Sequence, residues 1–278
     1  MNSELLLLLF KIIVQNSAYL ACLSWLAWRS ERRRGVDAFH LVIAYALGVW
    51  LVALFVDRLM LHPALAVLIA GITAFFVDSY WPNTSWKADD NMALVQVIVA
   101  ASIALIAFDW ATAHTPISLP VASNDTRNVF FICSVITWVL IFALKTRANI
   151  MLRLGTRNRW AMEYWGRPVP RNLVHITALA ALCWLPVLAI PLTTTGLLSS
   201  TVLKDVAIAI LIARVSGSRG PLIILALSFT LSTLRVGVAF ALPNNVGPPM
   251  VEAMVFVSLL FWLRRRQSRT AWQEEYAR

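Results

Sequence analysis

Long runs of apolar residues fill this chain almost from end to end, and they constrain its fold more than any other feature. A helix that crosses the hydrocarbon core of a bilayer needs roughly 20 residues, at about 1.5 Å of rise per residue. The sequence therefore predicts an all-α fold, a polytopic membrane helix bundle of about nine transmembrane helices. The expected spans are about 4–28, 39–56, 59–77, 92–110, 129–145, 173–192, 197–214, 221–242 and 246–263.

Composition supports this class. The chain is 59% hydrophobic and 14% charged, whereas soluble domains are nearer half apolar and a quarter charged. The spans leave no room for a separate soluble domain, so we expect residues 1–278 to form one transmembrane domain. The second and third spans are joined only by Asp57 and Arg58, which predicts a tight helical hairpin or a re-entrant element.

The positions of lysine and arginine predict the orientation of the bundle. Of the 24 such residues, 19 fall in one set of alternate loops, two in the other set and three inside spans. Cytoplasmic loops carry the excess of positive charge, so we expect the N-terminus outside and the C-terminus in the cytoplasm. This bias fits a bacterial inner membrane. The net charge of +10 is then loop charge, not a nucleic-acid-binding surface.

The stretch 145–172 is the largest cytoplasmic loop expected. It alternates apolar residues with arginines, namely Arg147, Arg153, Arg157 and Arg159. Such a segment is typical of an amphipathic stretch that lies along anionic lipid headgroups. An alternative is that this loop and the cytoplasmic tail 264–278 dock a cytoplasmic or membrane protein partner.

The sequence predicts no cofactor and no metal site. Nucleotide-binding, zinc-protease and nucleophile-elbow motifs are absent. The pair Asp89-Asp90 has no further carboxylate nearby, which magnesium would require. The three cysteines, Cys22, Cys133 and Cys183, lie inside apolar runs without metal-ligand spacing, so we expect them to be buried as small hydrophobic residues.

Charged residues inside the spans are the most informative ones, because charge in hydrocarbon costs several kcal/mol unless it is paired or hydrated. At the rise of an α-helix, Asp205 lies roughly 12 Å, Glu252 roughly 16–18 Å and Arg235 about 21 Å from the cytoplasmic edge. Together with Lys204 they give two positive and two negative charges on three consecutive helices. The sequence therefore predicts a charge-balanced polar cluster near the bilayer midplane.

Two helical faces add polar groups to this region. Ser228, Ser232 and Arg235 share one face of the span 221–242, and Gly237 would allow a neighbouring helix to approach closely. Otherwise the small number of glycines, 10 in the chain, predicts that close helix crossings are scarce.

The first span carries a second polar face, formed by Lys11, Gln15, Tyr19 and Cys22. We expect this face to point into the bundle, because lipid would leave its polar groups unsatisfied.

These features favour a membrane transport or channel-type component with a polar pathway. Asp205 or Glu252 is the residue expected to couple this pathway to protons. The competing interpretation of the cluster is a charge-neutral network that only holds helices together. One alternative function is a non-catalytic scaffold or assembly subunit of a membrane complex. A third is an enzyme acting on a lipid-linked substrate, which lacks a nucleophile, base or metal set and ranks last.

Overall fold

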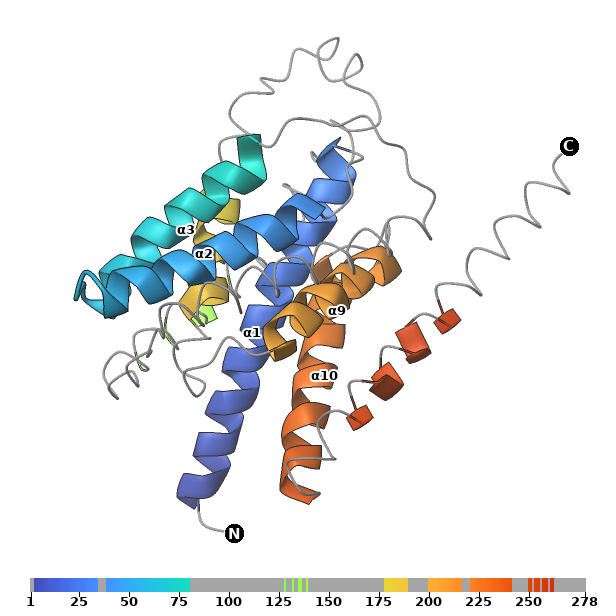
Figure 1. The fold of residues 1–278 in the computed structure, drawn as a ribbon. Helices are drawn as coiled ribbons and strands as arrows, with labels where there is room; N and C mark the ends of the chain where they lie inside the picture. Colours follow the sequence, from blue (N-terminus) through green and yellow to red (C-terminus); the bar gives the residue numbers. More distant parts are fainter. Residues whose placement is uncertain are drawn as a thin grey trace, which may run out of the picture.

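The structure is a computed structural model that describes residues 3–34, 39–80, 178–189, 200–216 and 221–241, with parts of 128–139 and 250–262. All regular secondary structure in these residues is α-helical. Figure 1 shows a bundle in which the longest helix runs through the middle. The labelled helices are α1 (Ser3–Arg34), α2 (Phe39–Asp57), α3 (Pro63–Tyr80), α9 (Ser200–Ser216) and α10 (Pro221–Ala241).

The apolar character of these helices fits a membrane protein. Within the described residues, three helices are long and apolar enough to cross a bilayer, at Glu4–Arg29, His40–Asp57 and Leu222–Ala239, and two shorter apolar helices cover Pro63–Ser79 and Ala178–Ala189. The expected total of about nine spans and the orientation of the termini stay predictions. The expected span 92–110 lies outside the described residues.

The second and third spans form the tight hairpin expected from the sequence, although its connection is longer than predicted. Helix α2 ends at Asp57 and α3 begins only at Pro63. The turn contains Met60 with a positive φ of 51°, and the Leu61 amide donates to the Phe55 carbonyl over 3.0 Å. Proline suits the first position of a helix because no intrahelical partner is lost there. The third helix therefore starts at residue 63 rather than 59.

Helix α1 is the element that the others share. It packs against α9 and α10, and these helices lie beside it in Figure 1. Side chains of α1 also contact the remaining helices: Tyr19 contacts α2, Arg29 contacts α3, and the thiol of Cys22 contacts that of Cys183 in the helix 178–189. Both cysteines are fully buried, as the sequence predicted.

Two glycines let the helix 178–189 approach α2 and α3 closely, contrary to the expected scarcity of close crossings. A Cβ atom on Gly48 would lie 2.9 Å from Leu188 Cδ2, and one on Gly71 would lie 3.3 Å from Leu185 Cδ2. The predicted contact at Gly237 is wrong within the described residues, where nothing lies within 4 Å of such an atom. Within the described residues, glycine therefore allows close helix packing in the N-terminal hairpin.

These glycines provide a matched test of the packing. Gly48→Val forces branched carbon atoms against Leu188, and overpacking of this kind costs about 1–3 kcal/mol. Gly237→Val adds the same atoms where no described residue lies within 4 Å, so we expect a change within about 0.5 kcal/mol. Thermal unfolding of the purified protein in detergent measures both. Equal losses in the two variants would contradict the packing described for the helix 178–189.

Candidate functional site

An ion pair joins α9 to α10. Arg235 Nη2 lies 2.6 Å from Asp205 Oδ1, and the two side chains are 17% and 16% exposed. Asp205 falls in the second turn of α9, and Arg235 falls in the second half of α10. The sequence placed these two residues in one cluster, and the structure brings them together. Their opposite charges balance, as partly desolvated charges require.

Two tyrosines extend this site to α1 and α2. The hydroxyl groups of Tyr19 and Tyr45 are 2.8 Å apart in a buried hydrogen bond. Tyr19 lies within electrostatic range of Asp205 and Arg235, and Tyr45 lies within range of Asp205. We refer to Tyr19, Tyr45, Asp205 and Arg235 as the polar cluster. Four different helices contribute to it, which places it where the bundle converges.

Serines of α10 continue the polar face on which Arg235 lies. Ser228 and Ser232 are buried, and the Ser228 hydroxyl has no hydrogen-bond partner within the described part of the chain. A buried hydroxyl without a partner costs free energy and suits a hydrogen bond to a bound water or solute. The hydroxyls of Ser24 and Ser79 are buried without a partner as well. Thr230 and Thr233 differ, because each is exposed and donates to the carbonyl four residues earlier in its own helix.

The structure describes the side chains of only some of the other predicted site residues. Lys11 donates a hydrogen bond to Asn128, and Lys11 and Gln15 are only half-buried, whereas Tyr19 on the same face of α1 is buried. Lys204 belongs to α9, but its side chain lies outside the described part, as does Glu252. The same holds for the loop arginines, namely Arg147, Arg153, Arg157 and Arg159.

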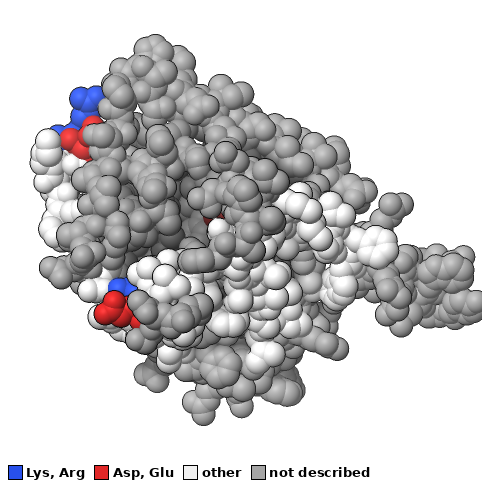
Figure 2. All heavy atoms as spheres, turned by 90° about the horizontal axis from the view of Figure 1, so that it is seen from below, with Lys and Arg blue, Asp and Glu red and all other residues white. Residues whose placement is uncertain are grey.

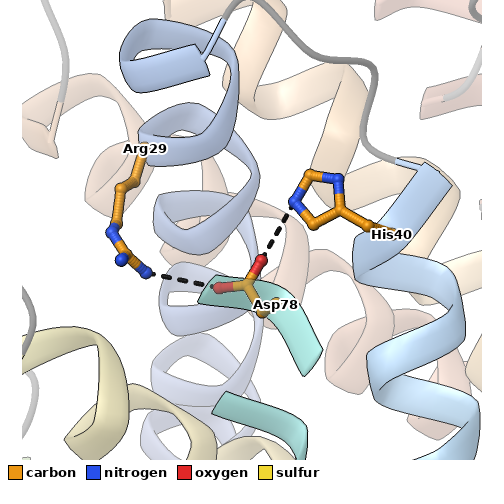
Figure 3. Close-up of polar contacts among 3 residues, drawn as sticks. All are labelled: Arg29, His40 and Asp78. Atoms are coloured by element: carbon orange, nitrogen blue, oxygen red, sulfur yellow. Dashed lines mark hydrogen bonds and ion pairs between the residues drawn. The ribbon is translucent and has the colours of Figure 1, made fainter. Parts of the chain in front are cut away.

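A second buried group of charged residues was not predicted. Asp78 of α3 lies between two basic side chains (Figure 3): its Oδ2 is 3.3 Å from Arg29 Nη1, and its Oδ1 is 3.0 Å from His40 Nε2. All three residues are at most 3% exposed. We refer to Arg29, His40 and Asp78 as the Asp78 cluster. It ties together the end of α3, the start of α2 and the last third of α1.

The position of Arg29 differs from the one expected from the sequence. Arg29 was counted as a charge of the first cytoplasmic loop, but α1 continues to Arg34 and buries Arg29. The alternating direction of the spans could have predicted this cluster. A chain that passes up, down and up again brings the end of the first span, the start of the second and the end of the third to one side. Arg29, His40 and Asp78 occupy those three ends.

The described surface offers a contrast to these buried groups. Figure 2 shows the face seen from below in the view of Figure 1. The described charged side chains at its edge lie in small groups containing both signs, and most of the remaining described surface is uncharged. Asp57 and Arg58 form an exposed ion pair at the α2–α3 turn, with 3.6 Å between Oδ2 and Nε. This pair lies in a more hydrated setting than the Asp78 cluster.

No metal centre emerges from the described residues, which contain no group of three or more His, Cys, Asp or Glu side chains arranged to hold an ion. Cys22 and Cys183 touch one another as free thiols. In chemical terms, the polar cluster presents a guanidinium, a carboxylate and hydroxyl groups. This set offers charged and neutral hydrogen-bond donors and acceptors, and the four residues contain no evident nucleophile–base pair.

The fold and these clusters define an all-helical protein with the apolar helices of a membrane protein. No family model and no curated protein sequence matches the chain. Among solved structures, PsaBC from Streptococcus pneumoniae in complex with Fab is similar, with a TM-score of 0.51 and 14% sequence identity over 92% of this chain and 90% of that chain. At this identity the likeness shows a shared fold alone, with a bacterial protein.

Breaking the Asp78 cluster tests its contribution to stability. Asp78→Asn leaves Arg29 buried without this counterion, a change that costs about 3–5 kcal/mol in buried pairs. Asp57→Asn is the matched control, because exposed pairs contribute about 0–1 kcal/mol. Thermal unfolding in detergent compares the two variants. An Asp78→Asn protein as stable as Asp57→Asn would show that the cluster does not hold the three helices.

The tyrosine pair allows an independent test. Tyr19→Phe removes one hydroxyl and leaves the buried Tyr45 hydroxyl without this partner, which costs about 1–3 kcal/mol. Removing both hydroxyls in Tyr19→Phe/Tyr45→Phe abolishes that penalty, so we expect the double variant to unfold at a higher temperature than Tyr19→Phe. A double variant that is less stable by the sum of both single losses would contradict a direct hydrogen bond.

Proposed function

We propose that this chain is a membrane transport or channel-type component whose pathway passes the polar cluster. The single observation that carries the proposal is the Asp205–Arg235 ion pair between α9 and α10. Both side chains keep an exposed fraction of about one sixth, although charge in an apolar bundle favours complete pairing and burial. The charged atoms of Arg235 are themselves covered, since its Nε and Nη2 are buried, so the proposal draws on a balanced pair of charges inside an apolar bundle, which is typical of ion and solute pathways.

The groups around the ion pair support the same proposal. Tyr19 and Tyr45 offer hydroxyls at one side of it, and Ser228 offers a buried hydroxyl two helical turns away on α10. A passing solute replaces hydrogen bonds to water with hydrogen bonds to such groups. Protonation of Asp205 would deprive Arg235 of its counterion, so the pair supports passage of a solute more than proton transfer through Asp205.

The proposal includes the finer features expected from the sequence. These are about nine spans in one domain, an external N-terminus, a cytoplasmic C-terminus and a bacterial inner membrane. Lys204 and Glu252 complete the charges of the site, and Lys11 and Gln15 line its approach along α1. The arginines of 145–172 contact lipid headgroups. The similarity of fold to a bacterial protein supports the bacterial membrane.

A scaffold or assembly subunit is the second candidate, and the Asp78 cluster favours it. Its three side chains are at most 3% exposed and hold the ends of three helices together, as a scaffold requires. In a scaffold the polar cluster is a structural network as well, and water does not reach it. The two candidates therefore differ in one measurable property, the access of water to the polar face of α10.

Cysteine labelling measures this access. In a background where the native cysteines are replaced, Ser228→Cys is exposed to a cationic, water-soluble methanethiosulfonate reagent in membrane vesicles. Phe229→Cys is the control at the same depth, because Phe229 lies on the exposed side of α10, which faces lipid in a membrane. A pathway predicts that Ser228→Cys reacts and Phe229→Cys does not. Two unreactive cysteines would favour the scaffold.

Charge variants then test the ion pair itself. We expect Asp205→Asn or Arg235→Ala to slow the labelling of Ser228→Cys markedly, because an unpaired charge repacks the site, while the protein still inserts and accumulates. The exchange Asp205→Arg/Arg235→Asp keeps the charge balance and serves as the control. If each single variant is lost from the membrane and a charge-neutral double variant restores full labelling, the pair is structural.

A further inference from the structure

The two buried clusters lie at different levels of the same helix. Tyr19 and Arg29 are ten residues apart on α1, which corresponds to about 15 Å along the axis. On α2, Tyr45 lies five residues beyond His40, or about 7.5 Å. Because α2 returns from the end at which α1 finishes, both helices place the polar cluster deeper in the bundle than the Asp78 cluster.

Between the two levels, the side of α1 that faces both clusters is apolar, and the buried Ser24 lies on another side of the helix. On the side of α1 that carries Tyr19 and Arg29, the intervening residues are Cys22 and Leu26, and both are fully buried. A solute that leaves the polar cluster toward the end of α1 therefore meets a short apolar layer and then the Asp78 cluster. Figure 3 shows Arg29 and His40 reaching Asp78 from opposite sides, so that the carboxylate joins α1 to the α2–α3 hairpin.

We propose that the Asp78 cluster is a lock that closes the pathway at the membrane face where α1 ends. This inference rests on the proposed function, since a lock requires a pathway to close. Asp78 holds the hairpin against α1 through two contacts to one carboxylate. When those contacts are exchanged for contacts with water, the ends of the three helices are free to separate. When they form again, the face closes.

The chemistry of the cluster suits a contact that opens and closes. Ion pairs and hydrogen bonds are directional, and hydrated alternatives to them exist at a membrane face, whereas an apolar seal has no such alternative partners. The charges of Arg29 and Asp78 cancel in the closed state, so closure buries no net charge from this pair. Each of the helices α1, α2 and α3 contributes one side chain to the cluster, so the ends of all three helices separate or come together at once.

Sidedness of labelling tests the lock. Ser228→Cys, in the cysteine-replaced background, is labelled with the cationic methanethiosulfonate reagent in right-side-out and in inside-out vesicles. The lock is removed with Arg29→Gln/Asp78→Asn, which deletes both charges together and leaves two amides. We expect the labelling rate from the face where α1 ends to rise at least about fivefold, the lower end of typical coupling between sites, while the rate from the opposite face stays the same.

The control is Asp57→Asn, which breaks the exposed pair with Arg58 and should change neither rate. If the double variant does not fold, His40→Gln replaces it. This change keeps the Arg29–Asp78 contact and weakens only the third member, so a smaller increase from the same face is expected. Folding is judged by the unfolding temperature and by gel filtration in detergent.

The remaining outcomes separate the lock from the pathway. The folded double variant could show the same Ser228→Cys labelling rate from the face where α1 ends as the protein with Arg29 and Asp78 intact. That result would overturn the lock and leave the pathway in place. A rise for Phe229→Cys equal to that for Ser228→Cys would overturn it too, because it indicates general loosening. A Ser228→Cys that reacts from neither face in any variant would overturn the proposed function itself, and the lock with it.

Discussion

A charge in an apolar bundle requires an opposite charge or a hydrogen-bond partner close by, and the arrangement of the N-terminal helices depends on this requirement. Asp78 meets it with Arg29 and His40, over distances of 3.3 and 3.0 Å. Those contacts exist only if α1, α2 and α3 reach the same level at one end. The cluster therefore sets the register of the α2–α3 hairpin against α1. Slippage by one helical turn, about 5.4 Å, would separate all three side chains.

Packing fixes the same register from the apolar side. The helix 178–189 lies against both members of the hairpin through Gly48 and Gly71, where a side chain would collide with Leu188 or Leu185. It also touches α1 through the thiol contact of Cys183 with Cys22. Apolar contacts have no preferred direction, so several alignments of the helices could fill the space equally well. The hydrogen bond and ion pair of Asp78 are directional, and they select one of these alignments.

Among the described residues, the sequence predicted the helices well and the polar groups in part, for physical reasons. Helices α2 and α10 follow their apolar runs within two residues, because the hydrocarbon thickness dictates the length of a run. Asp205 and Arg235 stand out in apolar runs on adjacent helices, so their proximity was predictable. Arg29 was not found, because counting loop charge treats an arginine at the end of a span as hydrated. Tyr45 was missed since tyrosine in an apolar run resembles a packing residue.

The two clusters differ in burial, and this difference bears on what each does. The Asp78 cluster is at most 3% exposed, as a contact that excludes water must be. The Asp205 and Arg235 side chains are 16% and 17% exposed, while the Arg235 nitrogen in the ion pair is itself buried. Ser228, on the polar face of α10, has no hydrogen-bond partner in the described part. The two clusters therefore lie at different levels of the bundle, and the Asp78 cluster is the more completely buried of the two.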